Sequence, residues 1–372
     1  MTGALSGQPV TIIGAGVAGL TAAVALARRG AAVTVFERSE AIREVGAGLQ
    51  ISPNAMRVID ALALGPAMRA ASVRSHAVQL RDSAGKPVIR MDLLAHRPAD
   101  EFRLIHRAQL IGLLADAVRA AGADIILGQQ IETPPEGALV VGADGLHSIV
   151  RRALNGREVP FFTRQTAWRA LIPDSGGAPE AQVFMGPRRH LVSYPLAGGL
   201  RNIVAVQERG DWQDEGWSHP DDPANLRAAF AGFGGPVPGW LAAVKRVHIW
   251  GLFRHEVARQ WHDGRLALIG DAAHPTLPFM AQGAVMAIED AWALAACLDA
   301  DPDQQAALTR YEALRKPRTA RIVAAADANA RNYHLSGPKR IAAHAALRVA
   351  NRVAAGRMLS RFDWLYDYDP VG

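Results

Sequence analysis

The chain has 372 residues, of which 49% are hydrophobic and 20% charged, with a net charge of +6 and a single cysteine, Cys297. This length suggests roughly two or three domains with a sizeable buried core, and the composition excludes disordered, collagenous and coiled-coil proteins. One cysteine forms no internal disulfide, so a disulfide scaffold is excluded and a reducing, cytoplasmic location is expected.

The positive charge is concentrated toward the C-terminus. Residues 310–361 hold 12 Lys and Arg side chains but only two acidic residues, Glu312 and Asp327. The segment lacks interleaved aromatic residues and any nucleic-acid-binding module, so we expect a solvated helical face and no nucleic-acid partner. The first ten residues have no signal-peptide pattern, and no run of 18 apolar residues predicts a membrane span.

The N-terminal segment is typical of a strand, a turn, a helix and a second strand. Residues 10–13 and 32–36 are the expected strands, and residues 20–29 are a helix rich in Ala and Leu. The turn carries the G-x-G-x-x-G pattern Gly14, Gly16 and Gly19, and Glu37 follows the second strand. In such a unit the glycines admit a pyrophosphate to the helix N-terminus and the acidic residue binds a ribose. The pattern therefore predicts dinucleotide binding.

Several shorter elements follow. Residues 53–72 have the apolar spacing of one helix, and residues 108–121 predict another. Residues 76–80 and 88–93 flank a Gly-containing loop and predict a hairpin. Short apolar runs at residues 125–127 and 138–141 predict buried strands.

A second motif comes directly after the last of these strands. The sequence Gly142-Ala143-Asp144-Gly145 lies at a strand–helix junction. From the sequence alone, Asp144 is best interpreted as a residue that caps the helix or stabilises the turn.

The region from residue 161 to residue 249 differs in sequence pattern from the region that precedes it. Short β-rich runs alternate with turns there, which predicts a second domain built mainly of antiparallel sheet. Residues 266–269 predict one more strand, and the remainder of the chain is mostly Ala-rich helix.

A third motif follows the strand at residues 266–269. Gly270 and Asp271 end that strand, and the next helix begins near Gly283 with its positive N-terminal end. Asp271 has the chemistry to accept hydrogen bonds from a polyol chain. His274 is interpreted as a buried histidine bonded to backbone, and no partner at ligand spacing predicts a metal site.

These three motifs, in this order, resemble those of the flavin-dependent aromatic hydroxylases, single-component monooxygenases with the p-hydroxybenzoate hydroxylase fold. The chain is most similar to the branch that contains salicylate hydroxylase, 3-hydroxybenzoate 6-hydroxylase and 6-hydroxynicotinate 3-monooxygenase. Residues 45–55, Ile105-His106-Arg107 and the pattern Tyr311-Glu312-x-x-Arg315-x-x-Arg318 are further stretches of resemblance. Ala281 departs from the family, which more commonly has Gly there.

The resemblance implies a set of FAD-binding residues. These are Gly14, Gly16, Gly19, Glu37 and Arg38 at the ADP half, Arg107 at the pyrophosphate or ribityl region, Gly270 and Asp271 at the ribityl chain, Gln50 and Ile131 near the flavin, Asp144 in a segment that serves FAD and the nicotinamide cofactor, and Gly283 at the flavin pyrimidine edge. A helix N-terminus at that edge would stabilise the negative charge of reduced flavin.

The resemblance also implies substrate residues. His190 and Tyr194 match a His-x-x-x-Tyr pattern that contacts the phenolic substrate, and positions four apart in a strand face the same side. His190 has a suitable ordinary pKa to take a phenolic proton. Gln282 is expected to bind a substrate carboxylate or hydroxyl.

The implied fold is of the α/β (α+β) class, with a Rossmann-like FAD-binding domain interrupted by a mainly antiparallel β substrate domain and followed by C-terminal helices. Residues 1–75, 97–160 and 250–307 are expected to form the FAD-binding domain, 76–96 and 161–249 the substrate domain, and 308–372 the C-terminal helical region. The expected partners are a small aromatic acid, O2 and NADH or NADPH, and the chain is expected to act as a monomer or homodimer.

The implied activity is NAD(P)H- and O2-dependent hydroxylation of a salicylate-like acid through a flavin C4a-hydroperoxide. Three alternatives stay open. One is an FAD-dependent epoxidase or reductase of the same fold that acts on a non-aromatic, apolar substrate. The others are a non-catalytic flavin-binding protein and a nicotinamide-only dehydrogenase.

Overall fold

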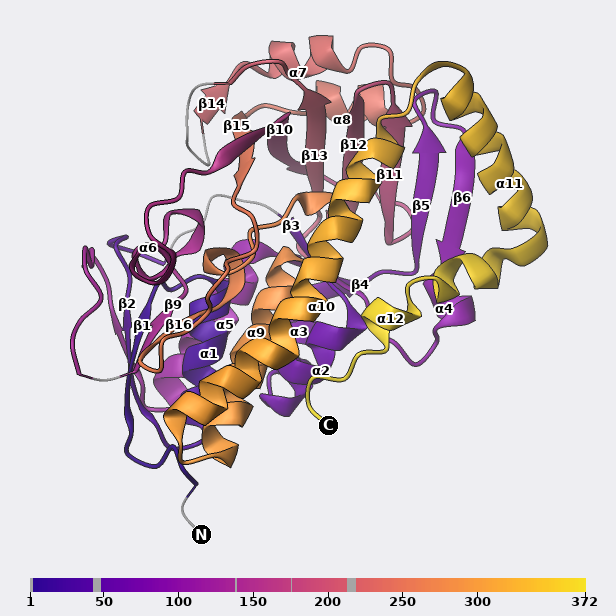
Figure 1. Ribbon diagram of the computed structural model, residues 1–372. Coiled ribbons are helices and arrows are strands. Elements are labelled where there is room, and N and C mark those ends of the chain that lie inside the picture. Colours follow the sequence, from indigo (N-terminus) through magenta and orange to yellow (C-terminus); the bar gives the residue numbers. More distant parts are fainter. Residues whose placement is uncertain (1–2, 43–47, 138, 175, 213–218) are drawn as a thin grey trace.

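The computed structural model describes residues 3–42, 48–137, 139–174, 176–212 and 219–372. Figure 1 shows two layers of structure, with a small parallel sheet and its helices on one side and a large sheet on the other. The mixed α/β class expected from the sequence is confirmed. The predictions that fall on residues 45–47 and on Ala138 lie outside the described residues.

The small sheet has five parallel strands in the order β16-β9-β1-β2-β8. The strands are β1 (Pro9–Ile13), β2 (Ala32–Phe36), β8 (Asp124–Ile126), β9 (Leu139–Gly142) and β16 (Leu266–Leu268). The chain leaves β1 toward β2 on one side, whereas β9 lies on the other side of β1. Such a reversal of strand order is where open α/β sheets bind ligands, at the carboxyl ends of the strands.

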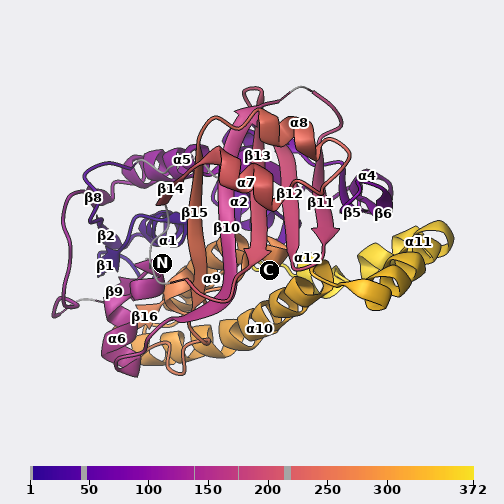
Figure 2. The ribbon, with the colours of Figure 1, turned by 90° about the horizontal axis from the view of Figure 1, so that it is seen from above.

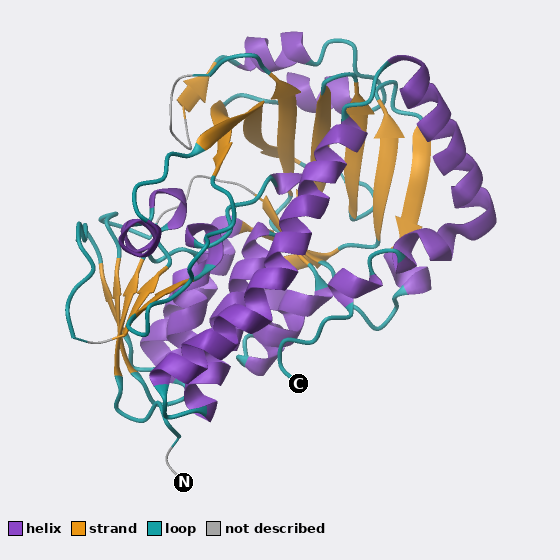
Figure 3. Ribbon diagram, in the orientation of Figure 1, coloured by secondary structure: helices purple, strands orange, loops and turns teal. Residues whose placement is uncertain are grey.

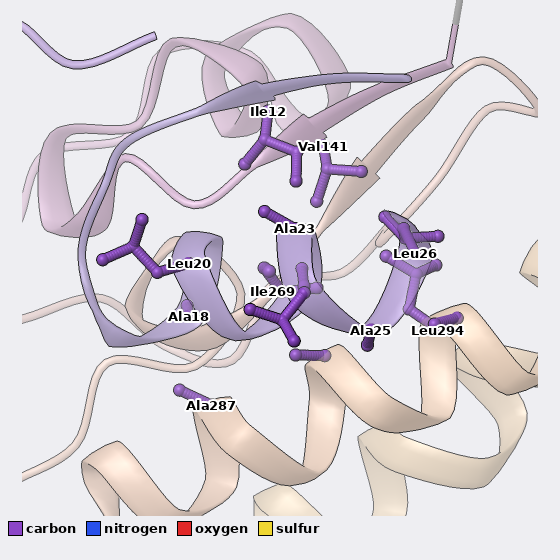
Figure 4. Packing of buried hydrophobic residues seen from close by; sticks show 14 of the residues in the cluster. Ile12, Ala18, Leu20, Ala23, Ala25, Leu26, Val141, Ile269, Ala287 and Leu294 are labelled. Carbon is purple, nitrogen blue, oxygen red and sulfur yellow. The ribbon is translucent and has the colours of Figure 1, made fainter. Parts of the chain in front are cut away.

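Helix α1 (Val17–Ala27) lies between this sheet and helix α9 (Gly283–Ala300), and ten of its residues are buried. Figure 4 shows Ile12 and Val141 of the sheet above α1, with Ala287 and Leu294 of α9 below it. The Ala-rich sequence explains this arrangement, because small side chains let two helices and a sheet approach closely while still excluding water.

The large sheet has eight strands in the order β14-β15-β10-β13-β12-β11-β5-β6, and every neighbouring pair is antiparallel except β11 and β5. The strands are β5 (Ala77–Asp82), β6 (Pro87–Asp92), β10 (Phe161–Pro173), β11 (Glu180–Gly186), β12 (Arg189–Leu196), β13 (Leu200–Glu208), β14 (His219–Asp221) and β15 (Val247–Arg254). The hairpin predicted at residues 76–93 therefore joins the same sheet as the β-rich region. The domain boundaries themselves stay a prediction.

The two faces of the large sheet have different coverings. Trp168, Phe184 and Leu191 point to the face covered by α7 (Pro223–Ala229) and α8 (Val237–Ala242). Figure 2 shows these two helices over the sheet, with α10 (Gln304–Tyr333) on the other side. Residues one position along in the strands, such as His190 and Arg169, face the second side because side chains alternate in a strand.

A three-stranded sheet lies between the two large layers, with the order β3-β7-β4. Its strands are β3 (Gly48–Ile51), β4 (Ser72–Arg74) and β7 (Arg103–His106). The backbone N–H of Gly48 donates to Oδ1 of Asn202 in the large sheet over 2.8 Å. A Cβ atom on Gly48 would lie 2.6 Å from Cε2 of Tyr194, so this position needs glycine for close contact between the layers.

The remaining helices mostly follow the predictions (Figure 3). They are α2 (Pro53–Ala61), α3 (Gly65–Ala71), α4 (Leu93–His96), α5 (Arg107–Ala120), α6 (Ile149–Asn155), α11 (Gly337–Ser360) and α12 (Asp363–Tyr366), with short 3-10 turns η1 (Gly145–His147), η2 (Gly270–Ala272) and η3 (Pro278–Met280). The single helix predicted over residues 53–72 is wrong. Ala63 has a φ of 48°, which ends α2, and α3 restarts with Pro66 in its first turn.

The C-terminal helices cross the whole molecule. α10 packs on α9, and α11 lies along β6, where Arg348 donates to Asp82 over 2.7 Å and Oδ1 of Asn351 accepts from the Arg90 N–H over 3.1 Å. Within the described parts of the chain, no helix is long and apolar enough to cross a membrane.

A buried cluster of charges ties α9 to α10. Glu289, Asp290 and Arg315 are fully buried, and Arg315 bonds both carboxylates, at 2.6 Å to Glu289 and 2.8 Å to Asp290. Arg318 pairs with Glu289 over 2.8 Å, and His274 with Asp290 over 2.5 Å. Burial alone would raise the pKa of Asp290, but His274 and Arg315 lower it to about 2, so the carboxylate is ionised at neutral pH.

Removing Arg315 should therefore destabilise the fold strongly. Arg315→Met leaves two buried carboxylates without their shared cation, which we expect to lower the free energy of unfolding by about 3–5 kcal/mol. Denaturant unfolding of the two variants Arg315→Met and Arg310→Met measures this. Arg310 is exposed on the same helix, so its loss should cost about 0.5 kcal/mol or less. Equal losses in the two variants would contradict the role of the cluster.

Candidate active site

The motif residues predicted from the sequence gather at one edge of the parallel sheet. Gly14 follows β1, Glu37 follows β2, Asp144 follows β9 and Gly270 follows β16. All these strands are parallel, so their carboxyl ends lie side by side. The turns after β1 and β9 are also in direct contact, because the Ala143 N–H donates to the carbonyl of Ile13, the last residue of β1, over 2.9 Å.

The three glycines of the first motif have different functions. Gly14 has a φ of 103°, and a Cβ there would lie 2.5 Å from the Ala143 carbonyl oxygen. A Cβ on Gly19 would lie 1.9 Å from the Gly14 carbonyl oxygen, so this glycine allows the helix to pack on the turn. A Cβ on Gly16 would meet no protein atom within 4 Å. Gly14 and Gly19 are thus needed by the fold, and Gly16 leaves open space above the helix N-terminus.

That open space has the electrostatics of an anion site. Gly16 is the N-cap of α1, and no side chain caps the helix, so the N–H groups of its first turn have no side-chain partner there. Glu37 accepts hydrogen bonds from the N–H groups of Ala15, over 2.8 Å, and Ser39, over 3.0 Å. Glu37 therefore fixes the glycine turn from the neighbouring strand, and Arg38 beside it is exposed.

The two carboxylate oxygens of Asp144 have different surroundings. Its Oδ2 accepts from the N–H of Ile149 in the first turn of α6 over 2.8 Å, as the structural interpretation expects. Its Oδ1 is buried without a hydrogen-bond partner among the described residues. Burial raises the pKa of this carboxyl, and nearby hydrogen bonds oppose the change. An orphaned buried acceptor at the edge of the sheet indicates a place for a ligand donor.

A hydrogen bond to the buried Asp290 carboxylate fixes the turn after β16. Gly270 has a φ of 59°, and its N–H donates to Asp290 over 3.0 Å. The next residue, Asp271, keeps its side chain exposed at the sheet edge. Surrounding protein nevertheless raises the pKa of the Asp271 carboxyl, against the opposing effects of His274 and Arg107. Arg107, at the start of α5, thus acts electrostatically on the carboxylate that the sequence predicts for the ribityl chain.

The interpretation of His274 as bonded to backbone is wrong. Its side chain is buried as expected, but Nε2 pairs with the Asp290 carboxylate, because that carboxylate is ionised and equally buried. In the described chain, no group of His, Cys, Asp and Glu side chains has the arrangement of a metal site.

A second helix N-terminus faces the same region. α9 begins at Gly283 after the N-cap Gln282, whose side chain does not cap the helix. Ala281 has a φ of 53°, so alanine occupies a left-handed conformation that explains why glycine is common at this position. The Gln282 amide donates to Ser52 Oγ over 3.1 Å and to the Met280 carbonyl over 3.4 Å. Its expected contact with substrate stays a prediction.

Two further residues were predicted to lie near the flavin. Gln50 is half-buried on β3, and Ile131 is half-buried in the loop after β8, packed against the main core. Their contact with a flavin also stays a prediction.

The predicted substrate residues lie on the second face of the large sheet. His190 and Tyr194 are both buried on β12. The His190 ring is 5.0 Å from the ring of Phe279 in η3, just before α9, and Tyr194 packs beneath β3. Burial lowers the pKa of His190 well below its usual value, helped by His334, and raises the pKa of Tyr194, with Arg169 opposing. At neutral pH, His190 is therefore a neutral base and Tyr194 a hydrogen-bond donor.

Three polar residues of this region were not predicted. Arg169 lies on β10 with its guanidinium 4.2 Å from the Trp250 ring, on the same face as His190. His334, after α10, bonds His190, and Glu208, on β13, bonds His334. A charged residue within the apolar run of β10 was a usable signal for Arg169. The other two gave no sequence signal, because their partners lie more than a hundred positions away.

Comparison with known proteins agrees with this geometry. A family model described as an FAD binding domain matches residues 8–138 and 135–326. A 3-amino-4-hydroxybenzoate 2-monooxygenase of Streptomyces platensis is 35% identical over 98% of this chain and 97% of its own length. A 3-hydroxybenzoate 6-hydroxylase of Polaromonas naphthalenivorans is 32% identical over 97% of this chain and 96% of its own.

The solved structures give the same result. A variant of Klebsiella pneumoniae HpxO complexed with FAD matches with a TM-score of 0.85 and 25% identity, over 98% of this chain and 100% of the other. The resemblance drawn from the motifs is confirmed.

The open space above Gly16 gives a direct test of the phosphate site. Gly16 has an ordinary extended backbone, with a φ of −78°, so Gly16→Val should fold normally. Its side chain would fill the space, and we expect the affinity for FAD to fall about 100-fold, or about 2.7 kcal/mol. Flavin absorbance of the purified protein and an FAD titration of the apoprotein measure this.

Gly112→Val is the matched control, because a Cβ at Gly112 also meets no protein atom within 4 Å but lies in α5. It should retain FAD. Normal FAD affinity in Gly16→Val would remove the phosphates from this position.

Proposed function

Because the chain belongs to the FAD binding domain family, we propose that it is an FAD-dependent monooxygenase that uses NAD(P)H and O2 to hydroxylate a small phenolic acid. The observation that carries the proposal is one sheet face that holds a neutral buried base, His190, a tyrosine donor, Tyr194, and a guanidinium, Arg169. That face lies beside the strand and helix ends that fit the cofactor. A hydroxyl and a carboxylate are the groups that such a set recognises.

The residues at the sheet edge fit FAD. The space above Gly16 and the uncapped start of α1 suit the pyrophosphate, with Gly14 and Gly19 shaping the turn. Glu37 and Arg38 would hold the ADP ribose side, and Arg107, Gly270 and Asp271 the ribityl side. Asp144 offers its orphaned Oδ1, Gln50 and Ile131 would flank the ring, and the start of α9 at Gly283 would meet the pyrimidine edge. Bound FAD, once reduced by NADH or NADPH, supplies the activated oxygen that is transferred to the ring.

The guanidinium of Arg169 would bind the substrate carboxylate. It stacks on Trp250, which holds its plane in one orientation, and its charge acts on Tyr194 across the same face. A planar, permanently charged donor in a partly buried position is well suited to a carboxylate. An acid bound there has its ring over β12 and β13, within reach of the two side chains at His190 and Tyr194.

His190 would remove the proton of the ring hydroxyl. Its lowered pKa keeps it unprotonated at neutral pH, so one ring nitrogen is available to accept the proton. Transfer of that proton leaves a phenolate, whose ortho and para carbons are electron-rich and attack the activated oxygen. Tyr194, which keeps its own proton, would donate a hydrogen bond to the substrate oxygen.

Apolar side chains around this face would keep water away. Trp250 and Phe279 are buried in one cluster with Val206, and Leu277 extends that cluster toward α9. Exclusion of water protects reactive oxygen species from hydrolysis and strengthens the polar contacts to substrate. We place the reaction in the cytoplasm, where NADH and NADPH are available.

The two curated relatives named above guide the choice of substrate. Their names give 3-amino-4-hydroxybenzoate and 3-hydroxybenzoate, both of them benzoates with a ring hydroxyl. We therefore infer a hydroxybenzoate, with or without an amino substituent, as the substrate class.

The experiment measures NADH and NADPH oxidation by the FAD-loaded protein with each of these two acids, then with salicylate and 6-hydroxynicotinate. We expect one acid to stimulate oxidation about tenfold or more, with one oxygen atom added to it in the mass spectrum. Benzoate, which lacks the hydroxyl, is the control and should give no product. No response to any phenolic acid would refute the proposed substrate class.

The role of Arg169 has a sharper test. Arg169→Met should raise KM for the acid about 10- to 100-fold, because a hydrogen-bonded ion pair worth about 1.5–3 kcal/mol is lost. The same phenol without its carboxylate is the matched control substrate. The variant and the wild-type protein should use it equally poorly. An equal loss on both substrates would show that Arg169 supports the fold and does not bind the carboxylate.

A further inference from the structure

Behind His190, a chain of three side chains connects the substrate face with the protein surface. Nδ1 of His190 is 2.8 Å from Nε2 of His334, and Nδ1 of His334 is 2.8 Å from Oε1 of Glu208. The three residues come from β12, the end of α10 and β13. His190 is 1% exposed and the side chain of His334 is 3% exposed, whereas that of Glu208 is 34% exposed.

The outer end of this chain lies in a polar surface pocket. The pocket has a volume of about 240 Å³, and Glu208 lines it together with Arg254, Asp327 and Arg331. Arg254 and Asp327 pair over 2.8 Å across the pocket. Glu208 is therefore the point at which the buried histidines meet solvent.

The hydrogen bonds determine which nitrogen of each ring carries the proton. The Glu208 carboxylate only accepts, so the His334 Nδ1–H must donate to it. Burial lowers the pKa of His334, although Glu208 opposes the change, so the ring is neutral at neutral pH and its Nε2 is an acceptor. His190 must then donate through Nδ1–H. Its Nε2, which has no hydrogen bond to the described part of the chain, is left as the basic nitrogen.

We propose that Glu208 and His334 form a proton relay that holds His190 in the tautomer of a base and carries the substrate hydroxyl proton to the surface. The substrate O–H bond breaks and an Nε2–H bond forms on His190. The Nδ1 proton of His190 passes to Nε2 of His334, and the Nδ1 proton of His334 passes to Glu208. Glu208 then releases a proton to water in the pocket, and the same shifts in reverse return a proton to the product oxygen and restore the starting tautomers.

The surroundings of the relay are compatible with this direction of transfer. Around His190 the neighbouring groups are aromatic, with Phe279 at 5.0 Å and Tyr333 at 5.2 Å between ring centroids. The charged groups that face the outer end are Arg188, 3.1 Å from Oε2 of Glu208, and the pocket residues Arg254, Asp327 and Arg331. The relay thus runs from an aromatic interior to charged groups and solvent at the surface, where a proton is better solvated than among the aromatic rings.

The tautomer can be measured without any substrate. In the holoenzyme labelled with ¹⁵N histidine, the His190 signal is the one that His190→Gln removes. We expect Nδ1 to carry the proton and Nε2 to be bare at neutral pH. A proton on Nε2 of His190 in the wild-type protein would overturn the relay. This result does not depend on the identity of the substrate.

The transfer of the proton is measured with a bound phenol. After a rapid pH jump, the rate at which bound 3-amino-4-hydroxybenzoate or 3-hydroxybenzoate becomes phenolate is followed by its absorbance in the oxidised holoenzyme, without NAD(P)H. Glu208→Gln keeps an acceptor for His334 but cannot take up a proton, so we expect this rate to fall about tenfold or more. His334→Gln, which interrupts the chain at its middle, should lower the rate as well and serves if the first variant folds poorly.

The direction of this change separates the relay from simple electrostatics. Loss of the negative charge of Glu208 would, by itself, favour phenolate and so would not slow its formation. Arg188→Gln, which keeps all three relay residues and removes a neighbouring charge, is the control and should change the rate by less. An unchanged or higher rate in both Glu208→Gln and His334→Gln would overturn the relay.

The inference rests on the proposed function only for this second measurement. If neither phenol binds the wild-type holoenzyme, the proposed substrate class fails, and the tautomer of His190 alone then decides whether the relay residues hold the ring as described.

Discussion

Two adjacent carboxylates in the middle of α9 are the constraint on which the site depends. Glu289 and Asp290 are neighbours in sequence, and successive side chains on a helix point in directions about 100° apart. Asp290 faces the turn after β16, where it binds the Gly270 N–H and His274, while Glu289 faces α2, where it accepts from Asn54 over 2.6 Å. Arg315 bonds both, so one cation fixes two contacts that run in different directions.

This arrangement places the cofactor edge on rigid elements. From Glu289 a line of hydrogen bonds runs through Asn54 and Ser52 to the amide of Gln282, at the start of α9. Arg318, which also binds Glu289, donates to the carbonyls of Trp364 and Leu365 near the C-terminus. The turn after β16, the start of α9 and the C-terminal segment are therefore positioned by one network. Sites with such a supporting shell keep their geometry because no member moves alone.

The parts of the site that lie within a short stretch of sequence were predictable. Gly14, Gly16, Gly19 and Glu37 belong to one βαβ unit, so their pattern predicts both the turn and its chemistry. The helix break at Ala63 was not predicted. Alanine in a left-handed conformation has no signature of its own, but Gly65 and Pro66 just after it were a usable signal for the break. The start of α9 was predicted, but the strain at Ala281 before it was visible only as a departure from the family.

Contacts between distant segments were the part that sequence reasoning missed. The pairing of His190 with His334 joins residues 144 positions apart, and that of His334 with Glu208 joins residues 126 apart. No periodicity or motif encodes such a pairing, since it depends on how α10 crosses the large sheet. The partner of His274, by contrast, lies only 16 positions away, yet the ionised state of Asp290 that attracts it depends on Arg315 from another helix.

The two buried histidines show why burial alone does not identify a functional residue. His274 and His190 are both almost fully buried, and each has one ring nitrogen bonded to another side chain. For His274 that bond leads to Asp290, which is itself enclosed and shared with Arg315, so a proton that enters there has no route outward. For His190 the bond leads through His334 to a carboxylate at the surface. A buried titratable ring is suited to proton transfer only when its hydrogen bonds end in solvent, and only His190 of the two meets that condition.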